Sequence, residues 1–175
     1  ADFMVRALGS QGLHDTVSLN SLVSPDTFIA GSWVRAIVLG QWPLPRVRLT
    51  GALFAQQPLP PPIDLWTMRN DTSRLEGLLK AHGLEKTQES AGGKLDKLCL
   101  PVVGKFVSKV VHWRRKFSPE AEVAPQTLVR VNFLAQKMAP DELVRHFVFR
   151  PDRYFFDGKT VVRHSFSEKG PLVDP

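Results

Sequence analysis

The chain contains 175 residues, 43% of them hydrophobic, and carries a formal net charge of +6 at neutral pH. This composition excludes overall disorder and allows either one domain or two small ones. The single cysteine, Cys99, excludes an internal disulfide and a cysteine-rich zinc site, and it favours an intracellular setting, with a mitochondrion or another organelle left open.

Residues 1–57 are predicted to form a β-rich N-terminal lobe that begins with a surface arm or short elements. Apolar residues recur at alternate positions over residues 33–39, and residues 46–50 alternate strictly, so both stretches favour strands. Two prolines between them suit a long loop that joins an antiparallel pair. Arg46 and Arg48, on the second strand, are candidates for contact with phosphate, although exposed strand arginines more often only face solvent.

A proline-rich segment, residues 58–66, is predicted to be a stiff connector to a second, α+β lobe over residues 67–175. Prolines favour an extended backbone and cannot continue a helix or a central strand. The apolar side chains at the end of the segment are expected to anchor the chain back onto the body.

The second lobe opens with a predicted helix over residues 71–82, whose leucines share one face. Ser73 begins a capping box, and Asn70 or Asp71 is an alternative cap. Gly83 suits the position just after the helix, where a left-handed conformation is common.

The positive charge is concentrated after a predicted mobile loop at residues 85–96. Residues 97–118 contain six basic residues and no acidic one, and the remaining 17 basic residues balance the 17 acidic ones. The whole positive excess can therefore be assigned to this stretch. A basic cluster favours a polyanionic partner, because cations placed near phosphates release condensed counterions.

Two periods compete within this stretch. As a helix over residues 101–117, its apolar residues gather on one half of the helical wheel, whereas a strand would mix apolar and charged groups on one face. Pro101 suits a first helical turn and Ser118, before a proline, suits the end. We therefore predict a basic amphipathic helix. The candidate nucleic-acid-binding residues are Lys105, Lys109, His112, Trp113, Arg114, Arg115 and Lys116, together with Arg46 and Arg48.

The C-terminal third is predicted to contain more strands. Residues 127–134 fit a strand or a helix, and their alternation favours the strand. Pro140 suits the first turn of a short helix. Residues 145–167 are predicted to be a hairpin sheet, with an Asp-Gly turn at residues 157–158 and a third strand at residues 146–149.

The predicted fold class is therefore α+β, with small antiparallel β elements packed against two or three helices, one of them strongly basic. The sequence contains none of the usual zinc-protease, nucleophile-elbow, dinucleotide-binding or calcium-loop motifs. Its five histidines are scattered and its carboxylates dispersed. No catalytic residue, metal site, cofactor or small-molecule substrate is predicted.

These observations predict a non-catalytic basic subunit of a larger, ribosome-like ribonucleoprotein assembly, in which the basic helix lies along an RNA backbone beside neighbouring protein subunits. The alternative is a structural adaptor in a protein-only assembly, such as a cytoskeletal, axonemal or respiratory complex. There the same helix would contact protein or a membrane surface, as basic amphipathic helices also do. A charged face that only meets solvent is the simplest reading of all.

Overall fold

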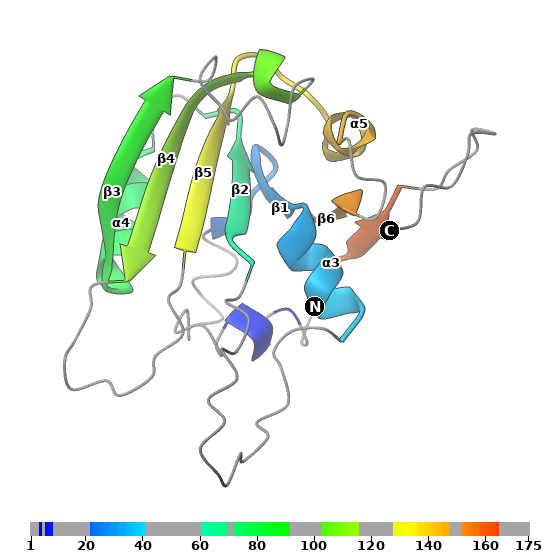
Figure 1. Ribbon diagram of the computed structural model, residues 1–175, viewed down its shortest axis with the longest axis horizontal. Helices are drawn as coiled ribbons and strands as arrows, with labels where there is room; N and C mark the ends of the chain where they lie inside the picture. Colours follow the sequence, from blue (N-terminus) through cyan, green and yellow to red (C-terminus); the bar gives the residue numbers. More distant parts are fainter. Residues whose placement is uncertain are drawn as a thin grey trace, which may run out of the picture.

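The computed structural model describes residues 4, 6–8, 22–40, 61–69, 72–91, 103–115, 128–147 and 152–164. Within these ranges the chain forms one seven-stranded sheet, in the order β3-β4-β5-β2-β1-β6-β7, together with short helices (Figure 1). The predicted α+β class is confirmed. None of the helices in the described ranges is long and apolar enough to cross a membrane.

The sheet is antiparallel except at one position. The strands are β1 Thr27–Ala30, β2 Ile63–Thr67, β3 Leu84–Ala91, β4 Val107–Arg115, β5 Leu128–Leu134, β6 Tyr154–Phe156 and β7 Val161–Arg163. Only β2 and β5, in the middle of the sheet, run parallel. All other neighbouring strands pair antiparallel.

The helices of the described ranges include α3 Ser32–Val38, α4 Ser73–Ala81, α5 Pro140–Arg145 and the 3-10 helix η2 Val103–Lys105.

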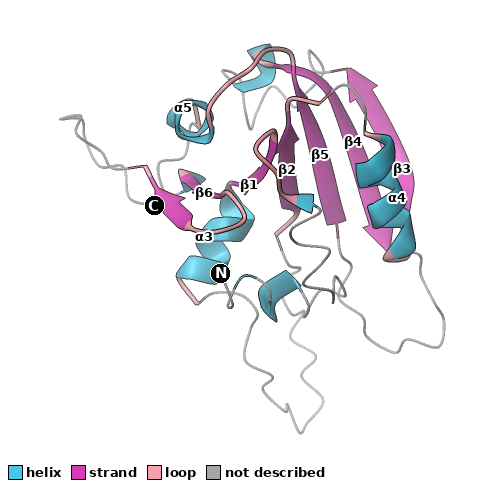
Figure 2. Ribbon diagram, turned by 180° about the vertical axis from the view of Figure 1, so that it is seen from behind, coloured by secondary structure: helices cyan, strands magenta, loops and turns pink. Residues whose placement is uncertain are grey.

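Each face of the sheet carries its own core. Leucines of α4 and apolar residues of α3 pack with Trp113 on one face, and Figure 2 shows α4 lying over β3 and β4. On the other face, α5 packs with Trp66 and Phe147, away from β3.

The strand predicted at residues 33–39 is wrong, because this segment forms helix α3. Gly31, with a φ of 107°, turns the chain out of β1 in a conformation that other residues rarely adopt. Trp33, Val34 and Ile37 are then buried together, at a helical spacing. Tertiary packing overrides the strand preference of these residues.

The apolar end of the predicted connector does anchor the chain onto the body, and it does so as the fully buried strand β2, Ile63–Thr67. This strand lies between β1 and β5 in the middle of the sheet. The predicted strand at residues 46–50, with Arg46 and Arg48, lies outside the described residues. The division into two lobes stays a prediction.

Helix α4 confirms the helix predicted at residues 71–82, and Gly83 follows it with a φ of 74°. The residue before the helix is Thr72 rather than Ser73, and its hydroxyl donates a hydrogen bond to the Glu76 carboxylate (3.3 Å). The mobile loop predicted at residues 85–96 is wrong where it is described, because strand β3 extends to Ala91. A strand that is polar on both faces has no hydrophobic period to reveal it.

Further along, strand β5 and the short helix α5 confirm the predictions at residues 127–134 and at Pro140. In the C-terminal part, β6 and β7 pair antiparallel and are joined by residues 157–160. The sequence predicts the turn at Asp157 and Gly158. In the structure the backbone N–H of Asp157 donates a hydrogen bond to the carbonyl oxygen of Thr160 (3.3 Å), so the two residues at the tip of the turn are Gly158 and Lys159. The Asp157 carboxylate accepts hydrogen bonds from the backbone N–H groups of Lys159 and Thr160, both at 2.8 Å.

The third strand predicted at residues 146–149 is wrong where it is described, and residues 148 and 149 lie outside the described residues. His146 ends helix α5 and the next residue, Phe147, belongs to no strand. The second neighbour of β6 is β1, from the N-terminal part of the chain. The hairpin is thus the outer part of the large sheet.

Candidate nucleic-acid interface

The basic helix predicted over residues 101–117 is wrong. The described part of this segment is the short turn η2 followed by strand β4, a nine-residue strand paired on both sides. Its valines and tryptophan are good strand formers. Backbone pairing with β3 and β5 supplies the hydrogen bonds that a helix would have made internally.

A strand divides the cationic residues between two faces, because successive side chains point to opposite sides of a sheet. Lys109, Trp113 and Arg115 lie on the side of α4, whereas His112 and Arg114 lie on the other side. We call the part of this second side around His112 and Arg114 of β4, together with the facing residues of β3, β5 and β2, the open face. Helix α4 lies behind the sheet from this side (Figure 1). The core that contains α5 covers the other end of the same side, including Val107 and Val110 of β4.

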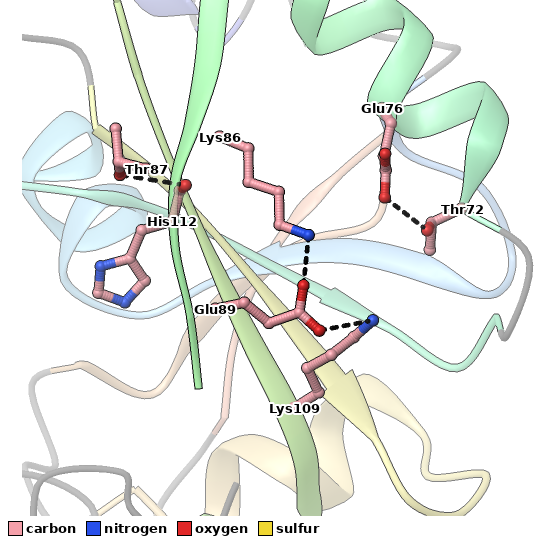
Figure 3. Close-up of polar contacts among 7 residues, drawn as sticks. All are labelled: Thr72, Glu76, Lys86, Thr87, Glu89, Lys109 and His112. Atoms are coloured by element: carbon pink, nitrogen blue, oxygen red, sulfur yellow. Dashed lines mark hydrogen bonds and ion pairs between the residues drawn. The ribbon is translucent and has the colours of Figure 1, made fainter. Parts of the chain in front are cut away.

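On the α4 side, two lysines share one glutamate. Glu89 of β3 lies 3.6 Å from the Lys109 amine and also pairs with Lys86 (Figure 3). The hydrogen bond from Lys86 lowers the pKa of Glu89 and raises that of Lys86. The Lys109 amine also lies 4.4 Å from the centre of the Phe133 ring, at cation–π distance.

Trp113 cannot stack on a base, because its side chain is only 1% exposed and packs in the core beneath α4. Arg115 is half-buried on the same side. Lys105 lies in η2 and is exposed. Lys116, like Arg46 and Arg48, lies outside the described residues.

The open face carries a polar row across four strands. In register order the row contains Gln88 of β3, His112 of β4, Arg130 of β5 and Asp64 of β2. The Arg130 guanidinium donates two hydrogen bonds to the Asp64 carboxylate, at 2.6 and 2.7 Å. The Asp64 side chain is only 9% exposed, so this two-point pair fixes Arg130 in place.

His112 stands at the centre of the row, beside two arginines. Burial is the largest cause that lowers the pKa of the half-buried His112 ring. The neighbouring Arg130 and Arg114 lower this pKa further, and Asp64 opposes them. The ring is therefore mostly neutral at neutral pH, since an unperturbed histidine titrates near pH 6.5.

Arg114 is exposed on the open face, two residues along β4 from His112. Glu85 of β3 is its register partner, and Leu128 of β5 lies opposite on the other side. The open face thus presents Arg114 and Arg130 together with Glu85 and Asp64. Among the described residues of this face, the positive charge is therefore local, at Arg114 beside the neutral His112 ring.

Sequence reasoning missed Arg130, Asp64 and Glu85 as parts of this surface. The alternation of Val129 and Val131 about Arg130 does place that arginine on a separate face of a strand. Nothing local, however, reveals that β2 and β5 pair in parallel, which brings Asp64 beside Arg130. Predicting this surface would have required the register between β2 and β5, which are far apart in the sequence.

A second ion pair lies near the row. Arg35 of α3 lies 3.1 Å from the carboxylate of Asp152, just before β6. Burial raises the pKa of Asp152, Arg35 lowers it, and the nearby Asp64 raises it again. Within the described ranges, no group of three or more histidine, cysteine, aspartate or glutamate side chains could hold a metal ion.

The fold and this surface define a mixed α+β protein with one long sheet, which α4 covers on one side of β3 and β4 and which carries the polar row of the open face on the other side. No protein-family model matches the chain, and no curated protein resembles it significantly in sequence.

Proposed function

We propose that this protein is a non-catalytic basic subunit of a larger ribonucleoprotein assembly and that it contacts an RNA backbone through the open face. The supporting observation is the placement of Arg114 and His112 side by side on that face, next to Arg130. The net charge of +6 favours the approach of any polyanion.

An open antiparallel sheet suits a single RNA strand, because a sheet can present several side chains to one backbone. Arg114 is the group best placed for a phosphate, since it is exposed and its guanidinium can donate to two oxygens at once. Arg130 is already paired with Asp64, so we expect it to bind a phosphate less strongly than Arg114 does. Contact with the backbone carries no base specificity, so weak sequence preference is expected.

The same contacts support the non-catalytic part of the proposal. The most buried carboxylates in this region, Asp64 and Asp152, are each paired with an arginine. A general acid or base needs a proton that it can exchange with a substrate at working pH. Charges held in such pairs stabilise the sheet instead.

The first prediction tests the RNA contact with two matched substitutions. Arg114→Gln should weaken binding of a single-stranded RNA and lower the salt slope of the affinity by about 0.7, the value for one lost phosphate contact. Arg74→Gln, at an exposed arginine of α4, is the control and should change neither quantity. Fluorescence anisotropy of a labelled oligouridylate, titrated at several salt concentrations, measures both.

Glu85 provides a second substitution for this test, because it lies beside Arg114 and its negative charge should repel a phosphate. Glu85→Gln should therefore tighten RNA binding, which a face that only meets solvent would not do. Equal effects of the Arg114 and Arg74 substitutions would contradict the proposal.

The protein-only adaptor remains the alternative, and exposed apolar side chains favour it. Among the described residues, Val38 and Leu39 at the end of α3 and Val162 of β7 are the large hydrophobic residues most exposed to solvent. Release of the native protein from its assembly by nuclease would support RNA binding. Nuclease-resistant association with protein partners would support the adaptor.

A further inference from the structure

His112 occupies an unusual position for a histidine, between two arginines on a polar face. Arg130 is its direct register partner in β5, and Arg114 follows two residues later in β4 on the same side. On the β3 side its partner is the uncharged Gln88, with Glu85 further along beside Arg114. Asp64 of β2 lies one strand beyond Arg130.

The backbone of His112 is held in place independently of its ring. Thr87 donates a hydrogen bond from its hydroxyl to the carbonyl oxygen of His112 (3.3 Å). In Figure 3 the ring lies on the opposite side of the strands from Lys86, Glu89 and Lys109. The charges that the ring meets are therefore those of the open face.

We propose that a phosphate group of a bound RNA strand lies against His112 and Arg114 and that His112 takes up a proton when the phosphate arrives. This inference rests on the proposed function and adds a regulation to it, namely RNA binding that strengthens as the pH falls.

The physical reason is that a bound phosphate changes the charges around the His112 ring. In the free protein, Arg114 and Arg130 disfavour a second positive charge on the ring, and partial burial adds to their effect. A phosphate carries a negative charge, so it offsets the arginines and favours the imidazolium form. The protonated ring can then donate a charge-assisted hydrogen bond to a phosphate oxygen.

Protonation of His112 is linked to RNA binding. The bound state holds the proton more tightly than the free state, so binding must tighten as the pH falls through the range between the two titrations. That range lies around and below neutrality, because an unperturbed histidine titrates near pH 6.5 and His112 starts below this value.

The second prediction is tested on the full chain with single-stranded oligouridylate as the probe. We expect its affinity to rise about three- to tenfold between pH 7.5 and 6.0, since one proton gives at most tenfold per pH unit. His112→Gln should lose this rise, which is judged against the variant's own affinity at pH 7.5. NMR titration of the wild-type histidine ring protons, with and without RNA, should show the pKa of His112 increasing on binding.

His82 serves as an internal control in the same spectra. It lies at the end of α4, which covers the opposite face, so its ring signals should not move when RNA is added. RNA binding that depends on salt and Arg114 but leaves the His112 titration unmoved would overturn this inference and leave the proposed function standing. Failure to bind RNA at either pH would overturn both.

Discussion

The Asp64 carboxylate holds Arg130 by two hydrogen bonds across β2 and β5, the one parallel strand pair of the sheet. Parallel pairing is slightly weaker per residue than antiparallel pairing, so a side-chain pair at this position adds stability where the ladder supplies less. Asp64 is buried, and water cannot replace Arg130 as its partner. A charge left without its partner in such a place is costly.

The third prediction follows for this pair. Asp64→Asn should lower the free energy of unfolding by about 1–3 kcal/mol, because it removes the charge that the Arg130 guanidinium faces. Asp141→Asn is the matched control, since Asp141 forms an exposed pair with Arg145 at 3.6 Å in α5. That control should change the stability by at most about 0.5 kcal/mol. Urea denaturation measures both, and equal losses would show that the buried pair has no special role.

At the scale of elements, β4 determines what the cationic segment can do. A helix would have gathered Lys109, His112 and Arg115 on one surface, whereas the strand places His112 on one face and the other two on the opposite face. The described residues of the predicted cationic surface are therefore divided between two faces. Arg114, which interrupted the apolar side of the predicted helix, becomes the most favourably placed cation of the open face.

The fourth prediction tests the alternation along β4. Trp113→Ala should cost about 3–5 kcal/mol of stability, because the side chain is fully buried beneath α4 and its loss leaves a cavity. Arg114→Ala, one residue further on and exposed, should stay within about 0.5 kcal/mol. Comparable losses at the two positions in chemical denaturation would contradict the strand and its register.

At the scale of the whole molecule, the sheet unites distant parts of the chain. Strands β1 and β2, from the N-terminal part, lie between β5 and β6, from the C-terminal part. Removing them would separate β3-β4-β5 from β6-β7. It would also expose Val129 and Val131, which pack in the core shared with Leu65.

The fifth prediction uses this arrangement to test the two-lobe division. A fragment of residues 67–175 keeps β3 to β7 but loses β1 and nearly all of β2, so it should not unfold cooperatively. The full chain should show one transition that coincides in far-ultraviolet circular dichroism and tryptophan fluorescence. A fragment with its own sharp transition would instead support two lobes.

The sequence by itself determined the elements whose signals are local. The leucine spacing and the following Gly83 predict α4, Pro140 predicts α5, and the alternation about Arg130 predicts β5. Each of these signals depends on residues a few positions apart. The α+β class follows from such elements together.

Only the tertiary structure decided the remaining elements and, with them, the candidate site. The helical period fits the segment at β4 better than the strand period does, and yet pairing with β3 and β5 selects the strand. Strand β3 has no apolar period at all, and α3 is helical because its residues pack together in the core. Backbone hydrogen bonds and burial between residues distant in sequence set these outcomes, and no local pattern contains that information.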